Sequence, residues 1–147
     1  MEKINYIPFL KMKDSEISAL ISLEDDEKEE IIPFFDFPRR DEKKTRDPLA
    51  VSKSKEEVFI SGVTRSSSRI SKKLNKISKF YLDDFDVDYD LKPQGRDTYI
   101  QLIEEFSSLG MIPVTGVDRS DDHHDNIRYA IDNGLMSKDE IALRFLK

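Results

Sequence analysis

The chain has 147 residues and a formal net charge of −6, with 37% hydrophobic and 37% charged residues. This length and composition predict one domain with a buried core and a heavily charged surface. The chain contains no cysteine, which excludes disulfide bonds, a thiolate nucleophile and zinc bound through cysteine. No stretch approaches the roughly 20 apolar residues of a membrane span, and the N-terminus lacks the apolar core of a signal peptide. We therefore expect a single cytoplasmic domain, residues 1–147.

Charge is distributed unevenly along the chain. Residues 38–79 contain thirteen Lys and Arg against five Asp and Glu, which leaves a net charge of −14 on the remaining residues. Within this basic part, residues 39–55 show no hydrophobic periodicity and are predicted to form a mobile basic loop. An acidic protein binds nucleic acid poorly, because phosphate contacts need a positive surface. We expect no nucleic-acid partner except through the basic segment 39–79, for which a solvated surface is the simpler explanation.

Short hydrophobic runs alternate with helical patterns along the chain. In chain order, the pattern predicts a strand at 6–11, a helix at 14–23, a strand at 31–37, a helix at 56–79, a strand at 80–84, a helix at 97–109, a strand at 112–115 and a helix after Ser120. Residues 141–144 alternate as a strand does, although a helix over 140–147 is the alternative. Strands that alternate with helices predict βαβ units. The expected fold class is therefore α/β, with about five mainly parallel strands.

Each predicted strand carries a polar residue near its C-terminal end, which is the edge where α/β sheets bind their ligands. Alternate residues of a strand point to opposite faces. In the third strand, Tyr81, Asp83 and Phe85 form the more apolar set and are predicted to pack against helices. Asp84 and Asp86 are then predicted to point toward a barrel interior or an open crevice.

These strand ends support two hypotheses. In the first, they form a mixed-charge pocket for an anionic or metal-bridged ligand. Its anion-binding candidates are Lys11, Lys13, Arg119 and Arg144, and its metal candidates are Asp36, Asp84 and Asp86. In the second hypothesis the same residues form a buried salt network that neutralises itself, since buried charges are costly unless paired. Magnesium bound by Asp84 and Asp86 is the candidate cofactor, and the sequence identifies no catalytic residue.

Other motifs give weaker signals. His123 and His124 are adjacent, so on a helix they point about 100° apart and make a poor chelating pair; we expect them to be exposed. The Asp-rich run 83–90 lacks the glycine and the final glutamate of a calcium-binding EF-hand loop. The chain contains no glycine-rich phosphate loop, no Gly-x-Ser-x-Gly elbow and no HExxH motif.

Residues 6–20 read YIPFLKMKDSEISAL. They resemble the opening of the beta family proteins of phages and prophages, which reads Tyr-x-Pro-x-Leu-Lys-x-Lys-x-Gly-Glu and continues with Ala-Leu. Ser15 stands where the family tends to have glycine, and Asp36 stands where its second strand usually has glutamate. Three later segments, residues 80–86, 110–119 and 141–144, resemble the strands that follow, and the last match supports a strand at 141–144.

The resemblance implies a (β/α) barrel-like fold without an assigned reaction, encoded by mobile elements. One family member lies in an anti-phage defence cassette of satellite phages. The match spans nearly the whole chain but only about the first two-fifths of a typical member, so it implies the first half of a (β/α)8 barrel. A half barrel exposes two sheet edges that must be covered. We therefore expect self-association or a protein partner.

Three functional interpretations remain open at this stage. The first is a phage- or prophage-encoded protein that acts in phage–host conflict through a protein partner, in the cytoplasm of the bacterial host cell. The second is a phosphate- or metal-dependent barrel enzyme. The third is a truncated remnant without activity. Whether the chain is an enzyme is not decided by its residues.

Overall fold

The structure, a computed structural model, describes residues 5–39, 53–87, 91–137 and 139–145. Five strands form one sheet in chain order: β1 (Phe9–Lys11), β2 (Phe34–Asp36), β3 (Phe80–Asp83), β4 (Met111–Thr115) and β5 (Ala142–Leu143). Each neighbouring pair is parallel. The predicted α/β class is therefore confirmed, and the arrangement is that of half a (β/α) barrel. The ambiguous segment near the C-terminal end is a strand.

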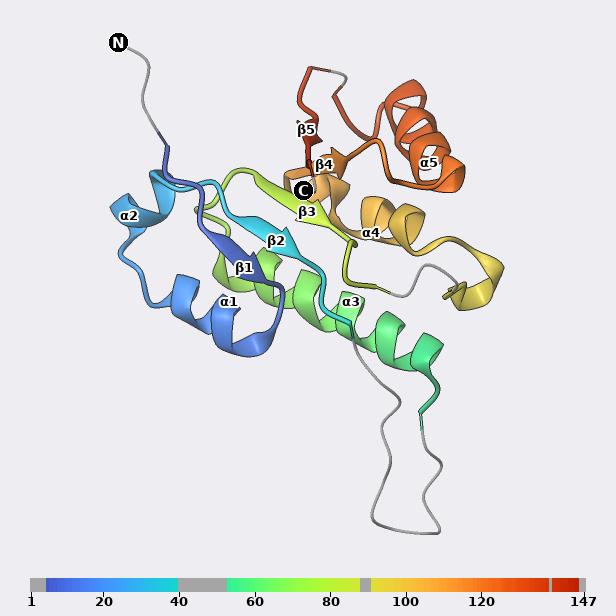
Figure 1. Ribbon diagram of the computed structural model, residues 1–147. Helices are drawn as coiled ribbons and strands as arrows, with labels where there is room; N and C mark the ends of the chain where they lie inside the picture. Colours follow the sequence, from blue (N-terminus) through green and yellow to red (C-terminus); the bar gives the residue numbers. More distant parts are fainter. Residues whose placement is uncertain (1–4, 40–52, 88–90, 138, 146–147) are drawn as a thin grey trace, which may run out of the picture.

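Helices connect consecutive strands: α1 (Asp14–Ile21), α2 (Asp25–Glu29), α3 (Lys55–Lys73), α4 (Thr98–Phe106) and α5 (Asp121–Asp132), with 3-10 turns η1 (Pro93–Gly95) and η2 (Ser107–Leu109). In Figure 1, α1, α3 and α4 follow one face of the sheet. Each packs against the next, and α5 packs against α4 and β4. The helices thus form one layer over the face that is the outside of a barrel.

Capping residues place the ends of three helices. Ser54 accepts a hydrogen bond from the Glu57 amide at the start of α3, Asp97 accepts one from the Tyr99 amide at the start of α4, and Ser120 accepts one from the His123 amide at the start of α5. The first turn after Ser120 is acidic, which the helix dipole favours. The starts predicted near Asp97 and Ser120 are confirmed.

The helix α3 is shorter than the helix predicted for this part of the chain. It was predicted over 56–79, whereas α3 ends at Lys73 and the chain then turns toward β3. Leu74 and Ile77 are nevertheless buried, because they enter the core from the turn that follows the helix. Gly62 and Ser66 do not break α3, and both are buried along it.

The core lies between the sheet and the helices. Phe35 and Phe80 pack edge-to-face with their ring centres 5.8 Å apart, and Phe80 packs in the same way on Phe106 of α4 at 6.1 Å. Leu82 is fully buried in this core. The prediction that Tyr81 and Asp83 pack against the helices is therefore wrong. The residues of β3 that face the helices are Phe80 and Leu82.

The opposite face of the sheet carries none of the described helices. Phe9, Phe34 and Tyr81 lie beside one another on this open face, since the strand register pairs them directly. Their rings contact at centre distances of 5.0 and 5.7 Å. The Phe9 side chain lies at one edge of the sheet and is 76% exposed, while Phe34 is buried. In the described residues, β1 and β5 are the two edge strands.

Two further expectations concern regions outside the sheet. The predicted mobile loop 39–55 falls largely on residues 40–52, which lie outside the described residues, so it stays a prediction. Among the described helices, none combines the length and the apolar character that crossing a membrane requires.

Candidate functional site

The strand register brings three charged side chains to one line at the C-terminal ends of β1, β2 and β3. Lys11 pairs with Asp36, and Asp36 pairs with Asp83. Arg144, just after β5, donates from Nη1 to Asp36 at 2.6 Å and to Asp83 at 3.0 Å. These residues come from four strands or strand ends, yet they form one continuous row on the open face.

Asp83 is the centre of this row. Its side chain is fully buried, and both of its oxygens accept hydrogen bonds from Arg119, each at 2.7 Å. This two-point contact between a guanidinium and a carboxylate has the strongest geometry available to such a pair. Arg119 is itself only 7% exposed. Two arginines therefore share one buried carboxylate.

The Phe85 ring and the Asp86 carboxylate contact the cations of this row. The guanidinium of Arg119 lies 5.1 Å from the centre of the Phe85 ring, and that of Arg144 lies 4.8 Å from the same ring, within the range of cation–π contact. Lys11 bonds to Asp86 and lies 3.7 Å from Asp36. Phe85 and Asp86, which follow β3, thus cover the row.

We call these six charged residues the inner cluster: Lys11, Asp36, Asp83, Asp86, Arg119 and Arg144. Three cations meet three carboxylates, so the inner cluster is formally neutral. For both arginines, burial lowers the pKa, but the hydrogen bonds and charge of the aspartates outweigh this and raise it. Every cation has an acidic partner within 4 Å. This geometry favours the self-neutralising network over an anion-binding pocket.

Asp84 lies on the other side of the chain from Asp83. Its Oδ2 accepts a hydrogen bond of 2.9 Å from the Thr98 hydroxyl, at the first residue of α4. Its Oδ1 lies 3.7 Å from Nδ1 of His123 and 3.9 Å from Nη1 of Arg119. Burial raises the pKa of Asp84 to about 7, and the negative charges of Asp83 and Asp97 add to this, while Thr98 and Arg119 act against it.

His123 is buried, which contradicts the expectation that both histidines are exposed. Its ring stacks on Tyr99 at a centre distance of 4.2 Å, and its Nε2 lies 3.0 Å from the Val114 carbonyl oxygen. Burial, together with the positive charge of Arg119, lowers the pKa of His123 to about 4. The expectation failed because the partner ring, Tyr99, comes from α4 and not from the helix that carries His123.

The chain resembles one known protein family over most of its length. The model of the family described as Beta protein matches residues 6–146. The chain belongs to the Beta protein family. No curated protein and no solved structure gives a significant match.

In this member of the Beta protein family, the structure brings together five of the seven residues predicted for the site. Lys11, Asp36, Asp86, Arg119 and Arg144 all lie in the inner cluster. Lys13 does not, because β1 ends at Lys11 and Lys13 instead precedes α1, where it lies 3.9 Å from Glu16. Asp84 lies apart from the inner cluster, near α4 and α5.

The residue that sequence reasoning missed is Asp83. Face alternation alone places either Asp83 or Asp84 on the open face, and the apolar neighbours Tyr81 and Phe85 favoured the wrong choice. Register with Asp36 is the signal that identifies Asp83. That signal is a pairing between strands, so it is not present in the pattern of β3 itself.

Two of the three metal candidates lie together, and the third lies elsewhere. Asp36 and Asp86 share the cation Lys11, and Asp84 lies with Thr98 and His123. Within the described ranges, no group of three or more acidic or histidine side chains has an arrangement suited to a metal ion. Asp84 and Asp86 thus have different partners in this Beta protein family member, and a magnesium site built from them stays a prediction.

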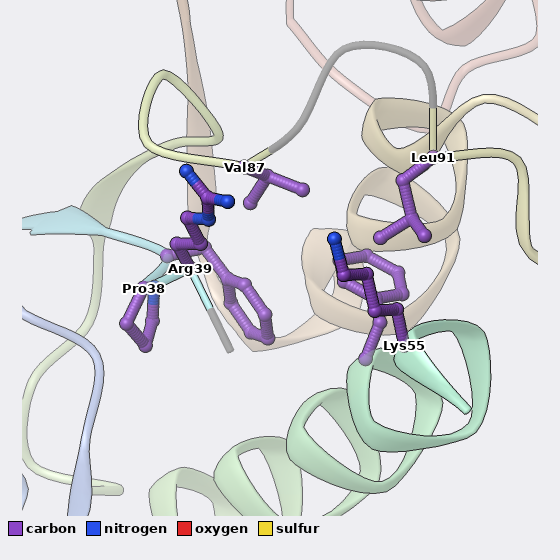
Figure 2. A pocket seen from close by; sticks show the side chains of 7 residues that line it. Pro38, Arg39, Lys55, Val87 and Leu91 are labelled. Atoms are coloured by element: carbon purple, nitrogen blue, oxygen red, sulfur yellow. The ribbon is translucent and has the colours of Figure 1, made fainter. Parts of the chain in front are cut away.

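Two cavities adjoin the C-terminal ends of the strands. One, after β2, has a volume of only about 10 Å³, enough for about one water molecule. Figure 2 shows Val87 and Leu91 on one side of it and Pro38 and Lys55 on the other. The second lies beside Asp84, Thr98 and His123 and has a volume of about 520 Å³, which is in the range of small-molecule sites.

Proposed function

We propose that the chain is a phage- or prophage-encoded member of the Beta protein family that acts in phage–host conflict through protein–protein contact, in the cytoplasm of a bacterial host. The observation that carries this proposal is the open face of the sheet, bounded by the edge strands β1 and β5. Strand edges that present unpaired backbone groups are sites of pairing with another chain. The family resemblance supports the biological context.

Several exposed apolar side chains lie at these two edges. Phe9 of β1 is 76% exposed, and Tyr6 just before it is also exposed. At the other edge, Leu143 of β5 is exposed and Phe145 is 77% exposed. Large exposed apolar groups of this kind mark interaction surfaces more often than isolated ones do. We therefore propose that both edge strands contact the same protein partner.

The partner that fits is a second copy of the chain. All five strands are parallel, so a two-fold axis along the strands places β5 of one copy beside β1 of the other in parallel, and the same contact occurs twice. Both edges are then covered, as in a closed barrel. The inner cluster does not oppose this approach, because its three cations and three carboxylates cancel.

Light scattering coupled to size-exclusion chromatography tests the contact. We expect the wild-type chain to be a dimer and Phe9→Asp and Phe145→Asp to be monomers, with unchanged circular dichroism because both side chains are exposed. Tyr129→Asp is the matched control, since Tyr129 is 53% exposed on α5, away from both edges, and we expect it to dimerise. A wild-type monomer across the micromolar range would refute self-association.

The role in phage–host conflict needs a cellular measurement. Bacteria that express the wild-type chain are infected with a panel of phages, and plaque numbers are compared with those for cells that express Phe9→Asp or Tyr129→Asp. Relative to cells without the chain, we expect the wild type and Tyr129→Asp to change plaque numbers for at least one phage. We expect Phe9→Asp to cause no such change. Plating equal to that of cells without the chain, for all three proteins across the panel, would favour an inactive remnant instead.

A further inference from the structure

The 520 Å³ cavity lies between the C-terminal ends of β3 and β4 and the N-terminal ends of α4 and α5. Asp84 and His123 line it, and Thr98 lies beside them. None of these three residues belongs to the inner cluster or to the sheet edges. These residues therefore lie outside the surface that we propose for self-association.

Asp84 has no cation of its own. Oδ2 accepts the Thr98 hydroxyl, but among the described residues Oδ1 has no donor within hydrogen-bond range. The nearest cationic nitrogen, Nη1 of Arg119, is 3.9 Å away and is bonded to Asp83 at 2.7 Å. The side chain is only 12% exposed, so water compensates little of its charge.

His123 faces Asp84 with an acceptor. The Val114 carbonyl can only accept a hydrogen bond, so the ring nitrogen 3.0 Å from it, Nε2, carries the proton. In the neutral ring, Nδ1 then holds a lone pair, and this atom lies 3.7 Å from Oδ1 of Asp84. Two acceptors thus converge on one point of the cavity wall. A nitrogen placed about 2.9 Å from each of them could donate to both.

The walls of the cavity favour a positive charge. Three further carboxylates line it, those of Asp97, Asp118 and Asp122. Lys92 lies 3.4 Å from Asp97 and 3.5 Å from Asp122, so it offsets only part of their charge. Arg119 also lines the cavity and its Nε lies 3.8 Å from Asp118, but both of its terminal nitrogens donate to Asp83, on the open face.

We propose that this cavity binds a small organic cation through a primary ammonium or a guanidinium group, whose N–H groups donate to Oδ1 of Asp84 and to Nδ1 of His123. The ligand supplies the donor and the positive charge that the protein does not provide at this point. Cation binding requires ionised Asp84, so it competes with protonation of this carboxyl. The ionisable groups near Asp84 are Asp83, Asp97, Tyr99, Arg119 and His123.

Calorimetric titration with ethylammonium and with methylguanidinium, at constant ionic strength, tests the site. Since the pKa of Asp84 is about 7, we expect the dissociation constant to rise about tenfold between pH 8 and pH 6. We also expect proton release on binding near pH 7, detected with buffers of different ionisation enthalpy. Tetramethylammonium has the same charge but no N–H donor, and we expect it not to compete.

Asp84→Asn is the decisive variant. Its amide oxygen can still accept the Thr98 hydroxyl, so we expect it to fold, to bind the cations at least tenfold more weakly at pH 8 and to lose the pH dependence. Asp121→Asn removes the same charge from an exposed position in the first turn of α5 and is expected to bind as the wild type does. No saturable binding, equal affinity for tetramethylammonium, or unchanged affinity of Asp84→Asn would overturn the proposal.

Discussion

Asp83 points onto the open face of the sheet and is bonded by two arginines, whereas Asp84 points toward α4 and α5 and is bonded by a threonine hydroxyl. Both carboxyls are largely removed from water. The cations compensate the charge of Asp83, while the pKa of Asp84 rises to about 7 because its burial is not compensated. The position of the partners, and not burial alone, therefore decides whether cations compensate the charge of a buried carboxyl.

The largest expected effect comes from removing the charge of Asp83. Asp83→Asn leaves two arginines near an uncharged amide, with one oxygen replaced by a donor. Breaking a buried ion pair by removing one partner costs about 3–5 kcal/mol. We expect a loss of this size in the free energy of unfolding, measured by urea denaturation at pH 7.

Asp86→Asn is the control for this change. Asp86 belongs to the same inner cluster but is more exposed, and its partner Lys11 is about half exposed. Exposed ion pairs contribute about 0–1 kcal/mol, so we expect a much smaller loss. Similar losses for the two variants would show that Asp83 is not the centre of the cluster.

The second effect concerns Asp84 and depends on pH. The pKa of Asp84 is about 7 in the folded chain and about 3.9 in an unfolded chain. The folded state therefore keeps a proton that the unfolded state releases, and this contribution to stability is lost as pH rises from about 4 to about 7. The loss is on the order of 4 kcal/mol when complete.

Asp84→Asn removes this titration while keeping a neutral side chain. We expect the excess of the variant over the wild type in unfolding free energy to grow by about 2–3 kcal/mol between pH 5 and pH 8, measured by urea denaturation at both pH values. His123 titrates with the opposite sign: its pKa of about 4 in the folded state makes stability fall as pH drops from about 6.5 toward 4. The difference between variant and wild type cancels this second contribution. A difference independent of pH would contradict the raised pKa.

The third effect concerns Tyr99 of α4, whose hydroxyl bonds to both β3 and β4. Its hydroxyl donates to the Leu82 carbonyl at 2.8 Å and accepts from the Val114 amide at 2.8 Å, and its ring stacks on His123. Tyr99→Phe leaves a buried carbonyl and a buried amide without this partner, which costs about 1–3 kcal/mol. Hydrogen exchange at the Val114 amide is expected to accelerate, while Tyr81→Phe, on the open face, should leave it unchanged.

The smallest effect is expected at Lys13. This side chain is 54% exposed and lies 3.9 Å from Glu16, a geometry that contributes little in water. We expect Lys13→Ala to change the free energy of unfolding by less than about 0.5 kcal/mol. A loss as large as that of Asp83→Asn would return Lys13 to the site that the sequence predicted for it.

Local signals predicted most of the fold. Caps at Asp97 and Ser120, apolar runs of strand length and the alternation of strands with helices led to a parallel α/β sheet, and the structure confirms it. Each of these signals depends on residues only a few positions apart. The predicted end of α3 was less accurate, because Leu74 and Ile77 continue the apolar spacing after the helix has ended.

The amino-acid sequence by itself determined the order of the elements and the presence of a polar residue near the end of each strand, because periodicity and capping act within one or two turns of chain. Only the tertiary structure decided that Asp83 meets Arg119, 36 residues away, and Arg144, 61 residues away. Such pairings depend on strand register and on loop geometry. For this reason two adjacent aspartates acquire different partners in the folded chain.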